Sequence, residues 1–302
     1  KGEVLDSQRQ RKGLREISNI PSHVTKKVAD LKISTVGQKT VDKSKHLPVS
    51  NFQKNANLKL QEKSLKNTEQ LCRSKEAIED IDKLYSNDVF LVSEYAKNVY
   101  SYLLSLENKF VINKWPLPNS KITEGMRIIL VDWLIDVHVD LNLLQETIHH
   151  TVAILDRYLQ VDNKLEKNIF QLVGISALSL ACKYEETLSP SFDDYIYLCK
   201  NAFDKKDLLK MEKKMLSALN FDLGRPVSII FLRRYNMAAK ANKLQHCYSK
   251  YFIDSALLDS NFCHIKPSLL AAAAAFIAMC IVNNAHLPSL WNTSMVHYTS
   301  YT

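Results

Sequence analysis

The chain has 302 residues, which is enough for one large or two modest domains. Its 6 glycines and 8 prolines are few, which favours an all-helical protein, and its six scattered cysteines argue against a disulfide framework or a zinc site. No run of eighteen apolar residues is present, so we expect no membrane span and no membrane partner. The formal net charge of +8 is unevenly distributed, since residues 1–80 carry 17 Lys and Arg against 10 Asp and Glu.

The basic N-terminal segment has little to bury. Its first 80 residues contain one aromatic side chain, Phe52. A chain with so few apolar groups does not offset its conformational entropy, so we expect residues 1–84 to form a disordered regulatory tail. Thinly spread lysines without interleaved aromatics are more typical of a solubilising tail than of a nucleic-acid site, so direct nucleic-acid binding is not expected.

Helical periodicity begins after the tail. The prolines of Trp115-Pro-Leu-Pro118 end the first helix, and Asp222-Leu-Gly-Arg-Pro226 marks the boundary between two folds. The alanine run 271–275 predicts a buried central helix, and no period-two pattern indicates a sheet. We expect helices near 88–107, 123–141, 145–160, 167–185, 191–200, 205–219, 226–240, 244–260, 267–284 and 289–299.

The helix near 123–141 is apolar almost all round, interrupted by Arg127, Asp132 and Asp136. Such a helix has to be covered on both sides, by a core and by a second surface or partner. Its sequence Met126-Arg-Ile-Ile-Leu-Val-Asp-Trp-Leu134 resembles the opening helix of the cyclin box.

This resemblance implies an all-α, double cyclin-box fold of two five-helix bundles. The first box and a preceding helix would occupy residues 85–222. The second would occupy 223–302 and stop one helix short, which would leave an apolar groove. The segments 132–138 and 183–186 resemble B-type mitotic cyclins, and 221–226 with 231–235 lean towards the third, usually nuclear, animal B subtype. We therefore expect a nuclear protein, with the cytoplasm as a second location.

The resemblance also implies a partner, a cyclin-dependent kinase that this chain would activate in mitosis. Lysines and glutamates at a helix end are usually a solvated terminus, yet the segment 183–186 resembles the family's kinase-contacting motif, and Glu212 matches a second position that works with the lysine. The implied kinase-binding residues are Lys183, Tyr184, Glu185, Glu186, Glu212, Tyr95, Val99 and Tyr102.

One face of the helix near 123–141 carries apolar side chains at i, i+3, i+4 and i+7. Without the resemblance, plain core is an equally good interpretation. In cyclins this face docks Arg-x-Leu motifs of substrates and inhibitors, which implies a patch of Met126, Ile129, Leu130, Trp133, Asp136 and Gln171. Asp136 has a shorter reach than the Glu of some cyclins. The family further implies that Arg127 and Asp156 form an internal, structural ion pair.

The tail contains the pattern Arg-x-x-Leu-x-x-Ile-x-Asn, formed by Arg11, Leu14, Ile17 and Asn19. This pattern fits the destruction box read by the anaphase-promoting complex, the ubiquitin ligase. An extended, lysine-bearing tail suits such a signal, so we expect degradation through ubiquitination.

No local signature of an enzyme is present, so we expect no catalytic residues, no cofactor and no metal site. His149 and His150 are adjacent on a helix and point about 100° apart, which favours two separate histidines over one site. One alternative is a cyclin-fold adaptor in transcription that binds DNA or peptides, but residues 81–302 are almost neutral, with 23 basic and 22 acidic side chains. A helical enzyme, the other alternative, lacks a site.

Overall fold

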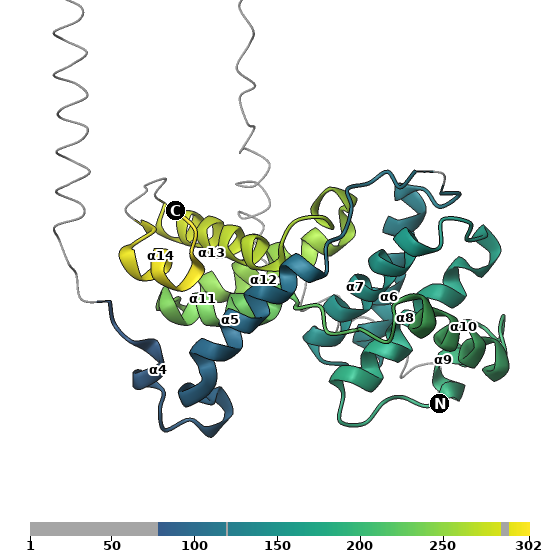
Figure 1. Cartoon of the computed structure of the whole chain (residues 1–302), viewed down its shortest axis with the longest axis horizontal. Coiled ribbons are helices and arrows are strands. Elements are labelled where there is room, and N and C mark those ends of the chain that lie inside the picture. Colours follow the sequence, from purple (N-terminus) through teal and green to yellow (C-terminus); the bar gives the residue numbers. More distant parts are fainter. Residues whose placement is uncertain (1–77, 119, 285–289) are drawn as a thin grey trace, which may run out of the picture. The chain divides into compact units, whose positions relative to one another are not determined.

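The computed structural model describes residues 78–118, 120–284 and 290–302. Within these ranges every regular element is a helix, which confirms the predicted all-α class (Figure 1). The destruction-box residues Arg11, Leu14, Ile17 and Asn19 lie outside the described residues. The α-helices are α4 (Ile81–Leu84), α5 (Ser93–Lys109), α6 (Glu124–Asp140), α7 (Gln145–Val161), α8 (Phe170–Glu185), α9 (Phe192–Leu198), α10 (Lys205–Ala218), α11 (Ser228–Ala238), α12 (Lys243–Leu258), α13 (Pro267–Asn283) and α14 (Thr293–Thr299). The 3-10 helices are η1 (Val89–Leu91), η2 (Lys167–Ile169) and η3 (Ser260–Phe262).

The first hydrophobic core is built by α6 to α10 around α8. Almost every side chain of α8 is buried, so this helix is surrounded by its neighbours. Gly174 lets α6 approach, because a Cβ at this position would lie 2.8 Å from Cδ1 of Leu130. Side-chain caps fix the helix starts: Thr123 accepts from the N–H of Met126, and capping boxes open α9 and α10.

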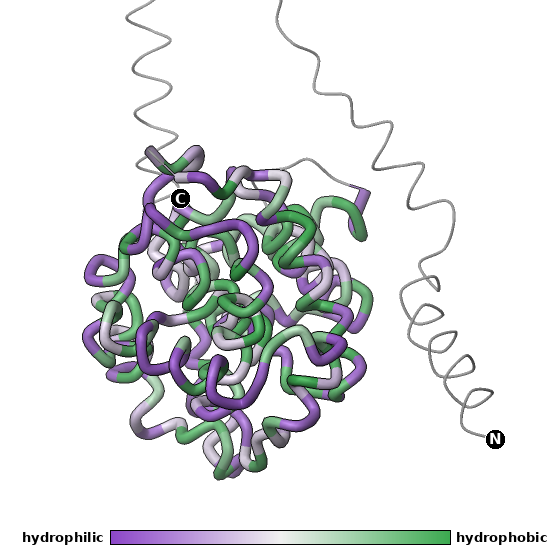
Figure 2. The backbone as a smooth tube through the Cα atoms, turned by 90° about the vertical axis from the view of Figure 1, so that its right-hand side faces the viewer, coloured by the Kyte–Doolittle hydropathy of each residue, from purple (hydrophilic) through white to green (hydrophobic). Residues whose placement is uncertain are grey.

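The second hydrophobic core is built by α11 to α14 around the alanine-rich α13. Ala271 and Ala275 are fully buried, as the alanine run predicted, because small side chains allow α11 and α12 to pack closely on α13. Figure 2 shows hydrophobic and hydrophilic stretches alternating along the backbone of the helical body. Leu219 and Val227 belong to different cores, so the predicted break 222–226 lies between them.

The helix that precedes the first box packs on the second core. Tyr100, Leu103 and Leu104 of α5 lie against that core, and Ile81 of α4 is buried in it. The assignment of residues 81–84 to a disordered tail is therefore wrong, since they form α4. The helix α5, which precedes the first box in the sequence, is covered by the second core, because an amphipathic pattern shows that a helix has an apolar face but not which core will cover it.

Two polar contacts hold this N-terminal segment on the second core. Arg234 of α11 donates to both carboxylate oxygens of Asp82 at 2.8 Å. Glu107 of α5 accepts from the backbone N–H and the hydroxyl of Ser268, each at 2.6 Å, at the start of α13. These contacts join α4 to α11 and α5 to the start of α13.

Candidate functional site

The centre of the candidate site is an ion pair between α8 and α10. The Nζ atom of Lys183 lies 2.6 and 2.7 Å from the two carboxylate oxygens of Glu212, and the hydroxyl of Ser179 donates to the same carboxylate at 2.6 Å. Glu212 is 5% exposed, whereas the Lys183 side chain is 42% exposed. The carboxylate is thus fixed from inside while part of the lysine remains accessible, so the lysine can make additional contacts from a defined position.

Exposed aromatic and aliphatic side chains lie on α5 and at the end of α8. Tyr95, Val99 and Tyr102 recur at helical spacing along α5, and each is exposed, as is Tyr184 of α8. The Tyr184 ring meets the His150 ring edge-on, with centroids 4.6 Å apart. Burial, together with the Glu185 and Asp222 carboxylates and Tyr102, raises the pKa of Tyr184. Exposed apolar side chains are thus available on both α5 and α8.

The two glutamates after Tyr184 have partners inside the protein. Glu185 contacts Nδ1 of His150 at 2.7 Å, and the other ring nitrogen of His150 contacts the carbonyl of Leu223 at 2.6 Å. Glu186 accepts from the backbone N–H of Leu144 at 2.7 Å and from the hydroxyl of Thr147 at 2.5 Å. These carboxylates attach the end of α8 to α7, and His150 continues the contact to the linker. Their role as kinase contacts stays a prediction.

The predicted docking patch is only partly at the surface. Ile129 is 72% exposed and Met126 and Trp133 are half-buried, but Leu130 is a core residue that packs over Gly174. Its inclusion in the patch is corrected accordingly, since the α6–α8 contact covers it. Asp136 is exposed, and Gln171 is half-buried at the start of α8. Partial burial and the neighbouring carboxylates of Asp132 and Asp140 raise the pKa of Asp136.

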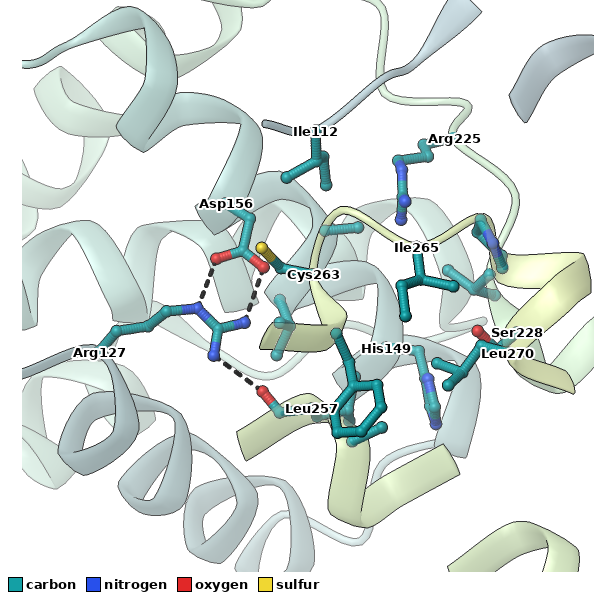
Figure 3. A pocket seen from close by; sticks show the side chains of 16 residues that line it. Ile112, Arg127, His149, Asp156, Arg225, Ser228, Leu257, Cys263, Ile265 and Leu270 are labelled. Carbon is teal, nitrogen blue, oxygen red and sulfur yellow. Dashed lines mark hydrogen bonds and ion pairs between the residues drawn. The ribbon is translucent and has the colours of Figure 1, made fainter. Parts of the chain in front are cut away.

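Arg127 and Asp156 form a buried, two-pronged ion pair (Figure 3). Two guanidinium nitrogens each lie 2.7 Å from one oxygen of Asp156, and the side chains are 1% and 3% exposed. The third nitrogen donates to the carbonyls of Leu257 and Leu258, at 3.0 and 3.2 Å. Burial alone would lower the pKa of Arg127, but Asp156 outweighs it and the pKa is raised. Sequence reasoning missed the link to the end of α12, because no local pattern signals a carbonyl 130 residues away.

The histidines and cysteines outside this site show no sign of catalytic or metal-binding chemistry among the described residues. His149 contacts Asp254 at 2.9 Å, separately from His150. Burial raises the pKa of Cys182 and Cys199 to about 11 and, with Asp156, that of Cys263 to about 12, so these thiols stay protonated at neutral pH. In the described ranges, no group of three His, Cys, Asp or Glu side chains is arranged to hold a metal ion. Nor is any helix there long and apolar enough to cross a membrane.

Two helical cores, a partly exposed lysine fixed by a buried glutamate, and exposed aromatic side chains on α5 and α8 are typical of a protein that presents a surface for binding. The family described as "Cyclin, N-terminal domain" matches residues 98–224, and "Cyclin, C-terminal domain" matches residues 226–302. The chain belongs to the cyclin family.

Curated relatives carry B-type names. The chain is 38% identical over 242 residues to "G2/mitotic-specific cyclin-B2" of Oryzias latipes, covering 79% of this chain and 61% of that protein. It is 39% identical over 224 residues to "G2/mitotic-specific cyclin-B" of Spisula solidissima, covering 74% and 51%. It is 42% identical over 225 residues to cyclin-B2 of Bos taurus, covering 74% and 55%. The chain thus spans between half and two thirds of these relatives' length. The lean towards the third B subtype stays a prediction.

A solved structure shares the fold. The X-ray structure of a viral cyclin from herpesvirus saimiri superposes with a TM-score of 0.56 at 22% sequence identity, covering 67% of this chain and 90% of that one. At this level of identity the likeness concerns the arrangement of helices alone.

Proposed function

We propose that this chain is a B-type mitotic cyclin that binds and activates a cyclin-dependent serine/threonine kinase at the G2/M transition. The names of its relatives support this role. The observation that carries the proposal is the fixed Lys183–Glu212 pair, next to the exposed Tyr184 on α8. The exposed Tyr95 and Tyr102 of α5 would extend this surface. Aromatic anchors around a polar centre are typical of protein interfaces.

The proposed activation mechanism depends on shape and hydrogen bonding and requires no catalytic group from this chain. Lys183 would donate to backbone carbonyls of the kinase, and Glu212 would hold Lys183 in position. The tyrosines and Val99 would cover the kinase's regulatory αC helix. Binding the active arrangement more tightly than the inactive one shifts the kinase towards activity, so that its αC glutamate pairs with the catalytic lysine and its activation loop opens.

Kinase capture by purified variants tests this proposal. Lys183→Ala combined with Glu212→Ala is expected to weaken kinase binding at least about tenfold, because it removes the polar centre of the surface. Lys214→Ala is the matched control, since Lys214 lies on the same helix as Glu212 but pairs with Asp162, at 2.7 Å. Circular dichroism would verify that both proteins are folded. Undiminished capture by the double variant of a folded protein would refute the interface.

A second surface would recruit substrates and inhibitors with Arg-x-Leu motifs. Ile129, Met126 and Trp133 supply the apolar face, and Asp136 lies one turn further on to receive the arginine. A labelled Arg-x-Leu peptide is expected to bind the protein and to lose affinity with Asp136→Asn, measured by fluorescence anisotropy. A peptide that binds both proteins equally would exclude Asp136 from recognition.

Degradation through the anaphase-promoting complex would end the activity. The pattern Arg11, Leu14, Ile17 and Asn19 supports this part of the proposal, together with nearby lysines that could accept ubiquitin. Arg11→Ala with Leu14→Ala is expected to prolong survival of the protein through mitotic exit, and unchanged turnover would refute the destruction box. Imaging of a fluorescent fusion in interphase tests the proposed nuclear location.

The competing role, a cyclin-fold adaptor in transcription, has less support. A DNA-binding surface needs net positive charge, whereas residues 81–302 are almost neutral. An activation assay with purified cyclin-dependent kinases separates the two roles, because an adaptor would leave kinase activity unchanged.

A further inference from the structure

His150 of α7 is buried and has a hydrogen-bond acceptor at each of its ring nitrogens. The residue is 1% exposed. Its Nδ1 atom lies 2.7 Å from a carboxylate oxygen of Glu185, the last residue of α8, and its Nε2 atom lies 2.6 Å from the carbonyl oxygen of Leu223 in the linker. One side chain of α7 thus joins the end of α8 to the segment between the two cores. We name His150, Glu185 and Leu223 the His150 clasp.

The two contacts of the His150 clasp need a proton on each ring nitrogen. A carbonyl oxygen only accepts hydrogen bonds, so Nε2 has to carry a proton to donate to Leu223. The Nδ1 atom of a neutral imidazole is then an acceptor, and an ionised carboxylate is an acceptor as well, so a second proton has to lie between Nδ1 and Glu185. Histidine ordinarily has a pKa of about 6.5 and glutamate one of about 4.3, so the ring is the stronger base and takes this proton. The clasp is therefore an imidazolium that donates to a carboxylate and to a carbonyl.

The other charged groups near the His150 clasp already have partners. In the linker, the carboxylate of Asp222 pairs with Lys109 of α5, and its carbonyl accepts from Arg157 of α7 at 2.7 Å. The titratable neighbours on α7 and α8 are also paired, as Glu146 with Arg233, His149 with Asp254, and Glu186 with Thr147. Glu185 is therefore the charge that His150 meets directly, and its side chain is 20% exposed.

Tyr184, the exposed tyrosine beside Lys183, packs against the His150 clasp. Its ring meets the His150 ring edge-on, with centroids 4.6 Å apart. Its hydroxyl lies over the linker, since a Cβ added to Gly224 would be 3.5 Å from the Tyr184 oxygen. Tyr184 and Glu185 are consecutive residues at the end of α8, so the contact that holds the carboxylate also holds the backbone from which Tyr184 projects.

We infer that His150 is a positioning residue of the kinase surface, whose imidazolium fixes Tyr184 by holding Glu185 and the linker together. This inference rests on the proposed function, because Tyr184 is one of the side chains expected to cover the kinase. Loss of one ring proton leaves Nδ1 as an acceptor that faces another acceptor, which weakens the hold on the end of α8. Because only the protonated ring makes both contacts, kinase affinity should be highest while the ring is protonated and should fall as pH rises and the ring loses its proton.

The pH dependence of kinase binding tests the inference. Nitrogen NMR of histidine-labelled protein should show both ring nitrogens of His150 protonated at neutral pH, and it gives the pH at which one proton is lost. Kinase affinity, measured by calorimetry, should be about fivefold weaker above that pH than below it, the loss typical of a displaced interface anchor. His150→Leu should have the weaker affinity at both pH values, and any pH dependence that remains in it belongs to the kinase. His149→Leu is the matched control, because His149 is the adjacent buried histidine and contacts Asp254 instead, at 2.9 Å, so this variant should keep the full pH dependence.

Glu185→Gln keeps the test decisive if His150→Leu does not fold. The amide of this variant can donate to an unprotonated Nδ1, so its contact with His150 needs no second ring proton and the pH dependence should disappear. An unprotonated ring nitrogen of His150 at neutral pH would overturn the inference. So would a pH dependence of kinase affinity that His150→Leu and Glu185→Gln share fully with the parent protein. Absence of kinase binding by every protein at both pH values would instead contradict the proposed function, and the NMR result would then decide alone whether the clasp holds an imidazolium.

Discussion

Replacement of Arg127 by Met is the perturbation whose cost can be worked out most fully. The substitution keeps an apolar stem but leaves Asp156, 3% exposed, without its two hydrogen bonds of 2.7 Å. Removing one partner of a buried ion pair costs about 3–5 kcal/mol. The carbonyls of Leu257 and Leu258 also lose their donor, at roughly 1 kcal/mol each. The expected destabilisation, about 5–7 kcal/mol, is a large part of the roughly 5–15 kcal/mol available to a typical domain.

Urea unfolding can separate these contributions. Fluorescence reports both cores, because Trp115 and Trp133 belong to the first and Trp291 packs against the second. Arg127→Met with Asp156→Leu removes both charges, so the double variant should recover most of the ion-pair cost and retain only the loss at the α12 carbonyls. If Arg127→Met is too unstable to purify, Asp156→Asn gives a milder measurement of the same pair. A loss of less than about 1 kcal/mol for Arg127→Met would refute this reasoning, as would a double variant no more stable than the single one.

Three further predictions concern single contacts. Asp136→Asn should raise the free energy of unfolding by about 0.5 kcal/mol at neutral pH, because a carboxyl whose pKa is raised in the folded protein destabilises it once ionised. Thermal unfolding at acidic pH, where the carboxyl is protonated, should show no such gain. Burial would raise the pKa of Asp162, but Lys214 and Tyr158 outweigh it and the pKa is lowered. The ionised carboxylate therefore stabilises the folded protein above its unfolded pKa, and this contribution is lost as pH falls. Asp162→Asn should cost up to about 1 kcal/mol of folding stability at pH 7 and nothing near roughly pH 2. Arg234→Lys keeps the charge but loses the two-pronged bond to Asp82, so hydrogen exchange of α4 amides should accelerate, and unchanged protection would argue against that clamp.

Local patterns in the sequence predict the helices well. The apolar spacing of α6 and α8, the proline before α11 and the alanine run of α13 each determine an element through interactions within a few residues. The capping boxes at Ser191 and Asp204 are equally local. Partners distant in sequence are a different matter. The Lys183–Glu212 contact joins positions 29 residues apart on two helices, and the prediction of it depended on family resemblance.

The errors share one physical cause, which is that tertiary packing decides what a side chain meets. The local sequence around Glu185 and Glu186 did not predict their partners on α7, His150 and Thr147. Leu130 has the spacing of an exposed face, but Gly174 has no side chain, so α8 packs directly against Leu130 and covers it. Ile81 stands among polar residues, so the local pattern does not show that it enters a core. One of its partners is distant in the sequence, since the hydroxyl of Tyr298 accepts the N–H of Ile81 at 3.1 Å.

The proposed kinase surface requires that the two cores keep their relative position. Tyr102 lies on α5, which packs against the second core, whereas Tyr184 and Lys183 lie on α8 of the first. The surface therefore exists only while the two cores keep their relative position, which Arg127 fixes from α6 to the end of α12. Loss of this link should weaken kinase binding even under conditions where each core stays folded, although Arg127 is buried and makes no contact with a partner. Kinase capture by Arg127→Lys below its melting temperature tests this coupling, and full affinity would show that the two cores hold their positions without the Arg127 link.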